Sequence, residues 1–150
     1  MRPRGFTLIE LMVALAVAVV LMSTAVPSFF ESTARARLQG AVNELAIDLQ
    51  YARSQAVRER AAVALTVAAD GASYTITDAN ATLKTVTLPR GVTLTAGAAV
   101  NFDALRSLSA ATLLDATVSG VTGSLRVNTN VLGRVQTCSL STAFGGYPAC

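Results

Sequence analysis

The sequence predicts an α+β protein in which a long N-terminal helix, partly membrane-spanning, packs on a small antiparallel β-sheet C-terminal domain. Three observations support this fold class. Residues 6–30 form an apolar run without a basic residue, helical spacing of apolar residues continues to about residue 60, and alternating apolar residues follow it. The 150 residues suit one domain, and 52% hydrophobic residues with a mean hydropathy of +0.50 exceed the needs of a soluble core.

Composition excludes most enzyme chemistry. The chain has no His, no Trp and only two Cys, so it can form neither a Ser–His–Asp nor a Cys–His unit nor a structural zinc site. No Walker A or Gly-x-Gly-x-x-Gly sequence occurs, and the nine acidic residues are scattered. We expect no enzyme, no catalytic residue, no metal and no cofactor. A carboxylate pair assembled by folding stays open.

The apolar run of residues 6–30 predicts a membrane span. As a helix it is roughly 37 Å long, enough for a hydrocarbon core of about 30 Å. Arg2 and Arg4 precede it and supply two of the three net positive charges, so the positive-inside rule keeps the N-terminus cytoplasmic and exports the remainder. The alternative is a secretory signal cleaved after Ala25. A carboxylate at Glu10 argues against this, because it costs roughly 2.5 to 3.5 kcal/mol in a spanning helix.

The opening sequence MRPRGFTLIEL resembles the class III signal of type IV prepilins and of type II secretion pseudopilins. The resemblance covers the basic leader, Gly5, Phe6, Glu10 and Pro27. It implies that a prepilin peptidase removes residues 1–5 by cutting after Gly5 and methylates the new N-terminal Phe6. It also implies that other pilin or pseudopilin subunits are partners through the N-terminal helix.

Glu10 has a specific role in this resemblance. Its carboxylate would pair with the N-terminal amine of a neighbouring subunit and set the register of the filament. The physics agrees, because a carboxylate in an apolar helix is tolerated when a cation partners it. The alternative is that Glu10 only lies among the lipid headgroups.

Residues 31–60 predict an amphipathic continuation of the helix, to about 80 Å in total. Pro27 should remove a hydrogen bond and kink or locally melt the helix. The stripe is expected to pack against the C-terminal domain, with a coiled-coil partner as the alternative. The stripe consists of Leu38, Val42, Leu45, Leu49, Ala52 and Ala56.

Residues 61–150 predict an exported β-rich domain. Alternating apolar residues around the Asp70-Gly71 turn indicate a hairpin over residues 63–76, and a last hairpin begins at Leu125, with its return strand starting at Gly133. Residues 105–123 show no clean period and are interpreted as loop with one strand near Thr117. Further short strands are expected at Val86 and Leu88, at Val92 and Leu94, and at residues 100–102.

Cys138 and Cys150 are the only cysteines, and export to an oxidising compartment predicts a disulfide between them. The bridge would close a loop of 13 residues and contribute about 3 kcal/mol in the chain-entropy model. It would also hold the C-terminus. Two free thiols are the alternative.

The β-rich domain and its last hairpin resemble the GspH/FimT family of minor pilins and pseudopilins. In FimT-type proteins a Gly-Arg-x-Arg motif is implicated in DNA binding. Here Gly133 and Arg134 match, whereas Gln136 replaces the second arginine and releases no counterion. Arg126 would complete a sparse basic patch with Arg134. Further candidates are Lys84 and Arg90 as cations, and Phe144 and Tyr147 for stacking.

The prediction is a structural subunit rather than an enzyme: a minor pilin or pseudopilin at or near the tip of a type IV pilus or type II secretion pseudopilus. It would sit in the bacterial inner membrane as a single pass with a periplasmic domain. Two alternatives stay open. One is a DNA-binding subunit for uptake, with solvated surface cations as the competing interpretation, and the other is a simple membrane-anchored periplasmic domain.

Overall fold

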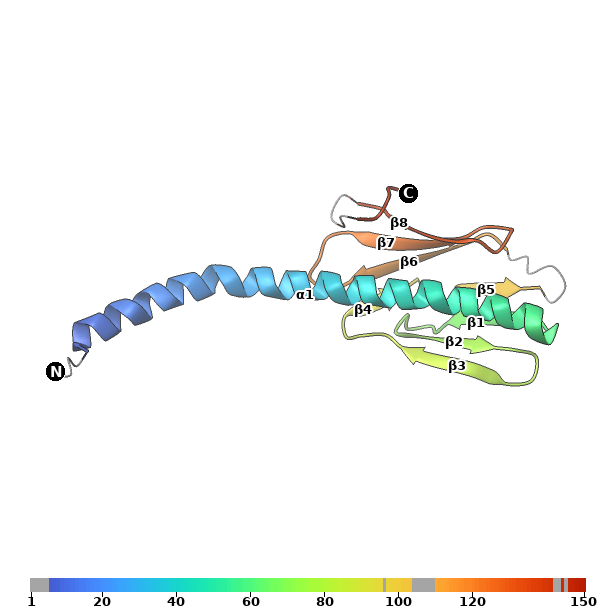
Figure 1. Ribbon diagram of the computed structural model, residues 1–150, viewed down its shortest axis with the longest axis horizontal. Helices are drawn as coiled ribbons and strands as arrows, with labels where there is room; N and C mark the ends of the chain where they lie inside the picture. Colours follow the sequence, from blue (N-terminus) through green and yellow to red (C-terminus); the bar gives the residue numbers. More distant parts are fainter. Residues whose placement is uncertain (1–5, 96, 104–109, 142–143, 145) are drawn as a thin grey trace, which may run out of the picture. The chain divides into compact units, whose positions relative to one another are not determined.

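The computed structural model describes residues 6–95, 97–103, 110–141, 144 and 146–150. Gly5 and the rest of the leader lie outside the described residues. One helix, α1 (Leu8–Glu59), precedes eight strands (Figure 1). The chain divides into two compact units, Met1–Thr33 and Ala34–Cys150, which are described separately.

The first unit consists mainly of the N-terminal part of α1. The helix is capped by Thr7, whose hydroxyl accepts a hydrogen bond from the Glu10 amide at 3.3 Å. Of the kink or local melting predicted at Pro27, local melting does not occur, because α1 runs through Pro27 without interruption. A proline removes one hydrogen bond of its own, and the turns on either side keep theirs.

The second unit is built on residues 34–59 of α1. All six residues of the predicted stripe are fully buried and share one hydrophobic core with the strands. The prediction that this stripe packs on the C-terminal domain is therefore confirmed. Each fully buried Leu or Val contributes about 1.5–3 kcal/mol relative to an exposed one, so the stripe holds the helix firmly against the sheets.

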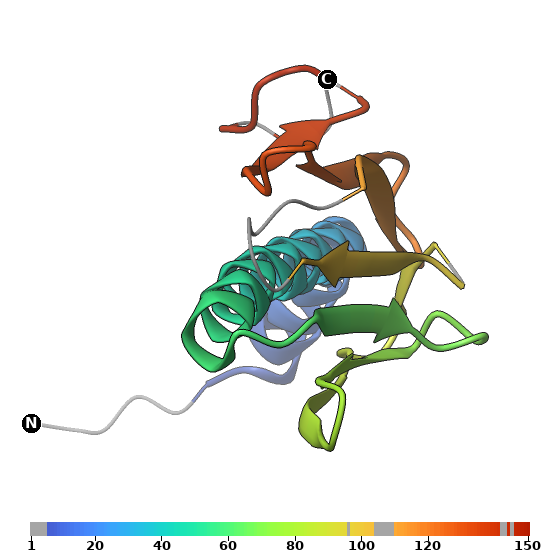
Figure 2. The same cartoon turned by 90° about the vertical axis from the view of Figure 1, so that its right-hand side faces the viewer.

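The strands form two four-stranded antiparallel sheets that lie along one side of this part of α1 (Figure 2). The first sheet has the order β3-β2-β1-β5 and the second the order β4-β6-β7-β8. In both sheets, alternate residues point into the core and the others face outward. The strands are β1 (Val63–Val67), β2 (Ser73–Thr77), β3 (Thr82–Thr87), β4 (Val92–Leu94), β5 (Ala99–Phe102), β6 (Thr112–Val118), β7 (Ser124–Thr129) and β8 (Val135–Ser139).

The two predicted hairpins are confirmed as β1-β2 and β7-β8. The strand predicted near Thr117 is confirmed as β6, which spans Thr112–Val118 and lies between β4 and β7 in the second sheet. The loop predicted around this strand is correspondingly shorter. Leu114, Ala116 and Val118 are its buried residues, so a period of two is present. Residues 104–109 lie outside the described residues.

The C-terminal segment is held by a disulfide and by backbone hydrogen bonds. Cys138 and Cys150 are bonded, which confirms the predicted bridge and excludes the two free thiols. The Ser139 amide donates to the Pro148 carbonyl at 2.8 Å, and the Cys150 amide donates to the Ser139 carbonyl at 3.1 Å. These contacts fix the chain end beside β8.

Candidate functional site

The apolar side chains of the first unit have no protein cover. The N-terminal part of α1 is long and apolar enough to cross a membrane, with a mean hydropathy of 2.4 over its most apolar 18 residues and none of those residues buried. Phe6, at the head of this segment, is exposed. Such a surface is stable only in lipid or against other apolar helices.

Glu10 lies in the first turn of α1, on this exposed apolar segment. Thr7 and Glu10 have the spacing of a capping box, and the hydrogen bond from the Glu10 amide to the Thr7 hydroxyl is one half of that motif. The Thr-x-x-Glu spacing is the sequence signal of this motif. The positive end of the helix dipole also stabilises a carboxylate at this position.

A buried polar cluster joins α1 to the first sheet. The Asp48 carboxylate accepts hydrogen bonds from the Tyr74 hydroxyl at 2.7 Å and from the Lys84 ammonium at 2.7 Å. Glu44 lies 3.5 Å from the same ammonium. The hydrogen bond from Lys84 to Asp48 raises the pKa of Lys84. Burial, followed by the separate hydrogen bond from Tyr74 to Asp48, raises the pKa of Tyr74. Lys84 is therefore a structural cation that is already neutralised.

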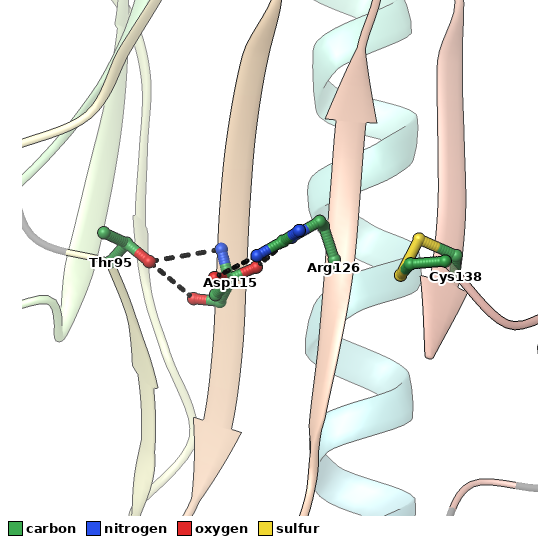
Figure 3. A network of polar contacts seen from close by, with 5 residues as sticks. Thr95, Asp115, Arg126 and Cys138 are labelled. Atoms are coloured by element: carbon green, nitrogen blue, oxygen red, sulfur yellow. Dashed lines mark hydrogen bonds and ion pairs between the residues drawn. A yellow bond between two sulfur atoms is a disulfide. The ribbon is translucent and has the colours of Figure 1, made fainter. Parts of the chain in front are cut away.

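Arg126 is also paired within the domain. From β7 it donates two hydrogen bonds to Asp115 on β6, at 2.6 and 2.9 Å, while Thr95 bonds the backbone of Asp115 (Figure 3). These bonds hold the pKa of the Asp115 carboxyl below its ordinary value. The bidentate geometry is the strong form of an arginine–carboxylate pair. Arg126 consequently adds little free charge to a basic patch.

The structure separates Arg134 from Gln136. Arg134 lies in the turn between β7 and β8 and lines a hollow against α1, whereas Gln136 lines a second hollow beside the disulfide. Arg53 on α1 lines the same hollow as Arg134, at a sequence distance that pattern analysis could not bridge. Arg90 is exposed in the connection between β3 and β4.

The two aromatic residues proposed for stacking do not form an open platform. Phe144 is buried in the hydrophobic core, and the hydroxyl of the half-buried Tyr147 donates to the Asn43 side chain at 3.3 Å. The expectation of two free stacking rings is therefore wrong. The ring of Phe144 packs in the hydrophobic core. Its burial could not be predicted, because the irregular segment around it has no periodic pattern. Within the described ranges, no group of His, Cys, Asp or Glu could hold a metal ion.

Comparison with known proteins decides the family. A family model for the type II transport protein GspH matches residues 41–142, which is more than half of the chain. The chain belongs to the GspH family. A second model, the prokaryotic N-terminal methylation motif, matches residues 1–26 of this GspH-family chain.

Two crystal structures of the type IV minor pilin FimU from Pseudomonas aeruginosa are similar to this GspH-family chain. One is 27% identical, covers 68% of this chain and 88% of that chain, and has a TM-score of 0.58. The other is 26% identical, covers 72% and 98% respectively, and has the same TM-score. No curated protein matches the chain. The predicted resemblance and the pilin-like fold are confirmed, and both point to a structural protein of pilin type with a prepilin-type apolar helix suited to inner-membrane anchoring.

Proposed function

We propose that this chain is a structural subunit that enters a type IV pilus or type II secretion pseudopilus at or near its tip and acts in filament assembly. Prepilin peptidase removes residues 1–5, and residues 6–30 form the transmembrane and filament-core helix. Residues 31–60 continue this helix, and residues 61–150 form the periplasmic globular domain. The N-terminus faces the cytoplasm before assembly.

The observation that carries the proposal is the apolar N-terminal part of α1, which has no buried residue in its most apolar 18 and a carboxylate in its first turn, within a segment that matches the N-terminal methylation motif. Cleavage after Gly5 creates an ammonium at Phe6. A carboxylate at Glu10 then gains a cationic partner from a neighbouring helix, which offsets the cost of its apolar surroundings. Register between subunits follows from this pairing.

Among the described residues, most of the candidates for DNA binding are engaged in other contacts or differ from the motif. Lys84 and Arg126 are paired with carboxylates, and Gln136 stands where the second arginine of the DNA-binding motif would be. Phosphate binding depends on the number of cations that release counterions. Filament assembly is therefore the function that we argue.

The test compares Glu10→Ala with Glu59→Ala, which removes an exposed carboxylate from the far end of the same helix. In cells that produce the filament, Glu10→Ala should be cleaved and membrane-bound but depleted at least about tenfold from sheared filaments, a loss of about 1.4 kcal/mol of assembly free energy. Glu59→Ala should assemble normally. Normal assembly of Glu10→Ala would reject the role given to this carboxylate.

A further inference from the structure

An open groove of about 450 Å³ runs between α1 and the turn that joins β7 to β8. The helix contributes one face at helical spacing, and the turn together with the first residue of β8 contributes three consecutive residues. The Asn130 side chain fixes this turn by accepting the amides of Leu132 and Arg134 at 3.0 and 2.8 Å. The lining residues are Gln50, Arg53, Ser54, Val57, Gly133, Arg134 and Val135.

Two guanidinium groups of this groove have no counter-ion among the residues that the structure describes. Arg53 is half-buried and Arg134 is exposed, and within the described part of the chain neither side chain has an ion pair or a hydrogen bond. Lys84 and Arg126, by contrast, are each held by a carboxylate. Guanidinium groups bind carboxylates in a bidentate manner, so these two side chains are suited to bind an acidic group.

Exposed aliphatic side chains accompany these charges. Val57 in the groove is 55% exposed, and Val131 and Leu132 in the same turn are 59% and 63% exposed. Exposed apolar groups rimmed by polar residues mark interaction sites, and arginine is enriched at protein interfaces. A nucleic acid backbone would instead require more free cations or stacking rings, and the groove lining contains no aromatic residue.

The chain's own carboxylates are mostly engaged, which favours an acidic group from another protein. Asp48, Asp115, Glu44 and Glu59 are ion-paired, and Asp70 and Asp78 accept backbone amides of their own turns. Glu31 also has an interaction partner. Outside the apolar helix, Asp103 alone has no partner among the described residues.

We propose that this groove docks an acidic segment of a different, neighbouring filament subunit. A carboxylate of that segment lies between Arg53 and Arg134, and its aliphatic neighbours pack on Val57, Val131 and Leu132. The proposal rests on the proposed function, since it takes the occupant from the same filament. Screening of the guanidinium–carboxylate attraction by salt makes the contact weaker at high ionic strength.

The test places a photo-cross-linking benzoylphenylalanine at Leu132 of the full chain, in cells that produce the filament. Light should join the chain to another prepilin-type subunit in the sheared filament fraction, at a peptide that contains Asp or Glu, as identified by mass spectrometry. Arg134→Glu, in an exposed turn, should lower the yield of this adduct at least about tenfold, and Arg53→Glu should act in the same direction. Arg90→Glu, an equal charge reversal at an exposed position outside the groove, should leave the yield unchanged.

Three results would overturn the docking proposal: an adduct with a second copy of this chain, an adduct with DNA, or no adduct in filaments that contain the chain. An unchanged yield in both Arg134→Glu and Arg53→Glu would do the same. The proposed function is tested separately by an immunoblot, which detects whether the unmodified chain is present in the filament fraction. Absence of a processed chain from that fraction would overturn the proposed function and the docking proposal together.

Discussion

At the scale of single residues, Asp48 connects three elements through one carboxylate. It lies on α1, is 4% exposed, and binds the Tyr74 hydroxyl of β2 and the Lys84 ammonium of β3. A buried carboxylate is stable only with such partners. The raised pKa of Tyr74 keeps its phenol protonated, so that it remains the donor.

Asp48→Asn should lower the free energy of unfolding by about 2 kcal/mol, because the Lys84 ammonium loses its closest counter-charge and a buried polar cluster loses an acceptor. Urea unfolding followed by circular dichroism, on the full chain in detergent, measures this. Glu44→Gln is the matched control: Glu44 is 51% exposed and 3.5 Å from the same ammonium, so it should cost less than about 0.5 kcal/mol. Equal effects of the two variants would refute the assignment of the cluster to Asp48.

Asp115 provides a pH-dependent contribution to stability. Arg126 holds the pKa of Asp115 below its ordinary value, so the folded state binds this proton less readily than the unfolded state. The contribution is present above an ordinary aspartate pKa of about 3.9 and is lost as pH falls through the lower pKa of the folded state. Asp115→Asn should therefore lose less stability than the unsubstituted chain between pH 6 and pH 2. Parallel pH profiles of unfolding free energy would contradict this.

At the scale of elements, periodicity predicted the helix stripe and both hairpins because each is a local pattern. The length of strand β6 was underestimated because two leucines, Leu113 and Leu114, are adjacent in it. The first is half exposed and the second is buried, so the sequence shows no alternation of apolar and polar residues at this point. The contacts that define the site are beyond such patterns. Asp48 and Lys84 are 36 residues apart in the sequence. Arg53 and Arg134 line the same groove only because the turn before β8 lies beside α1 in the folded domain.

The turn between β1 and β2 depends on Gly71 at a positive φ of 67°. Its carbonyl accepts the Leu94 amide at 2.9 Å, and a Cβ at this position would collide with the Leu94 carbonyl oxygen. Gly71→Ala should therefore destabilise the domain by more than about 1 kcal/mol. Gly40→Ala should instead stabilise it by about 1 kcal/mol, because Gly40 lies in the helix with open space around it.

Thermal unfolding of the two alanine variants, measured side by side in one detergent, checks this opposition. A Gly71→Ala protein as stable as the unsubstituted chain would show that the turn relaxes away from Leu94. A destabilised Gly40→Ala protein would show that the exposed face of α1 has a close neighbour at this position.

At the scale of the whole molecule, the two units have opposite surfaces. The N-terminal unit exposes the apolar side chains of its helix, whereas the C-terminal unit buries a core of apolar residues and holds Lys84 and Arg126 in ion pairs with carboxylates. This division suits a subunit whose helix is transferred from lipid to a bundle of similar helices, while its domain folds independently of that transfer. In the docking that we propose, the groove with Arg53 and Arg134 gives the C-terminal domain a contact with a neighbouring subunit, in addition to the contacts of the N-terminal helix.

The processing step is the point at which a pilin-type subunit differs from a secreted or simply anchored protein. The decisive measurement is the intact mass and N-terminal sequence of the membrane-extracted chain, expressed with and without an active prepilin peptidase. We expect a mature chain that begins at N-methylated Phe6 when the peptidase is present, and an uncleaved chain when it is absent. A chain that begins at Val26, or one that retains Met1 in the presence of the peptidase, would contradict the assignment to a filament.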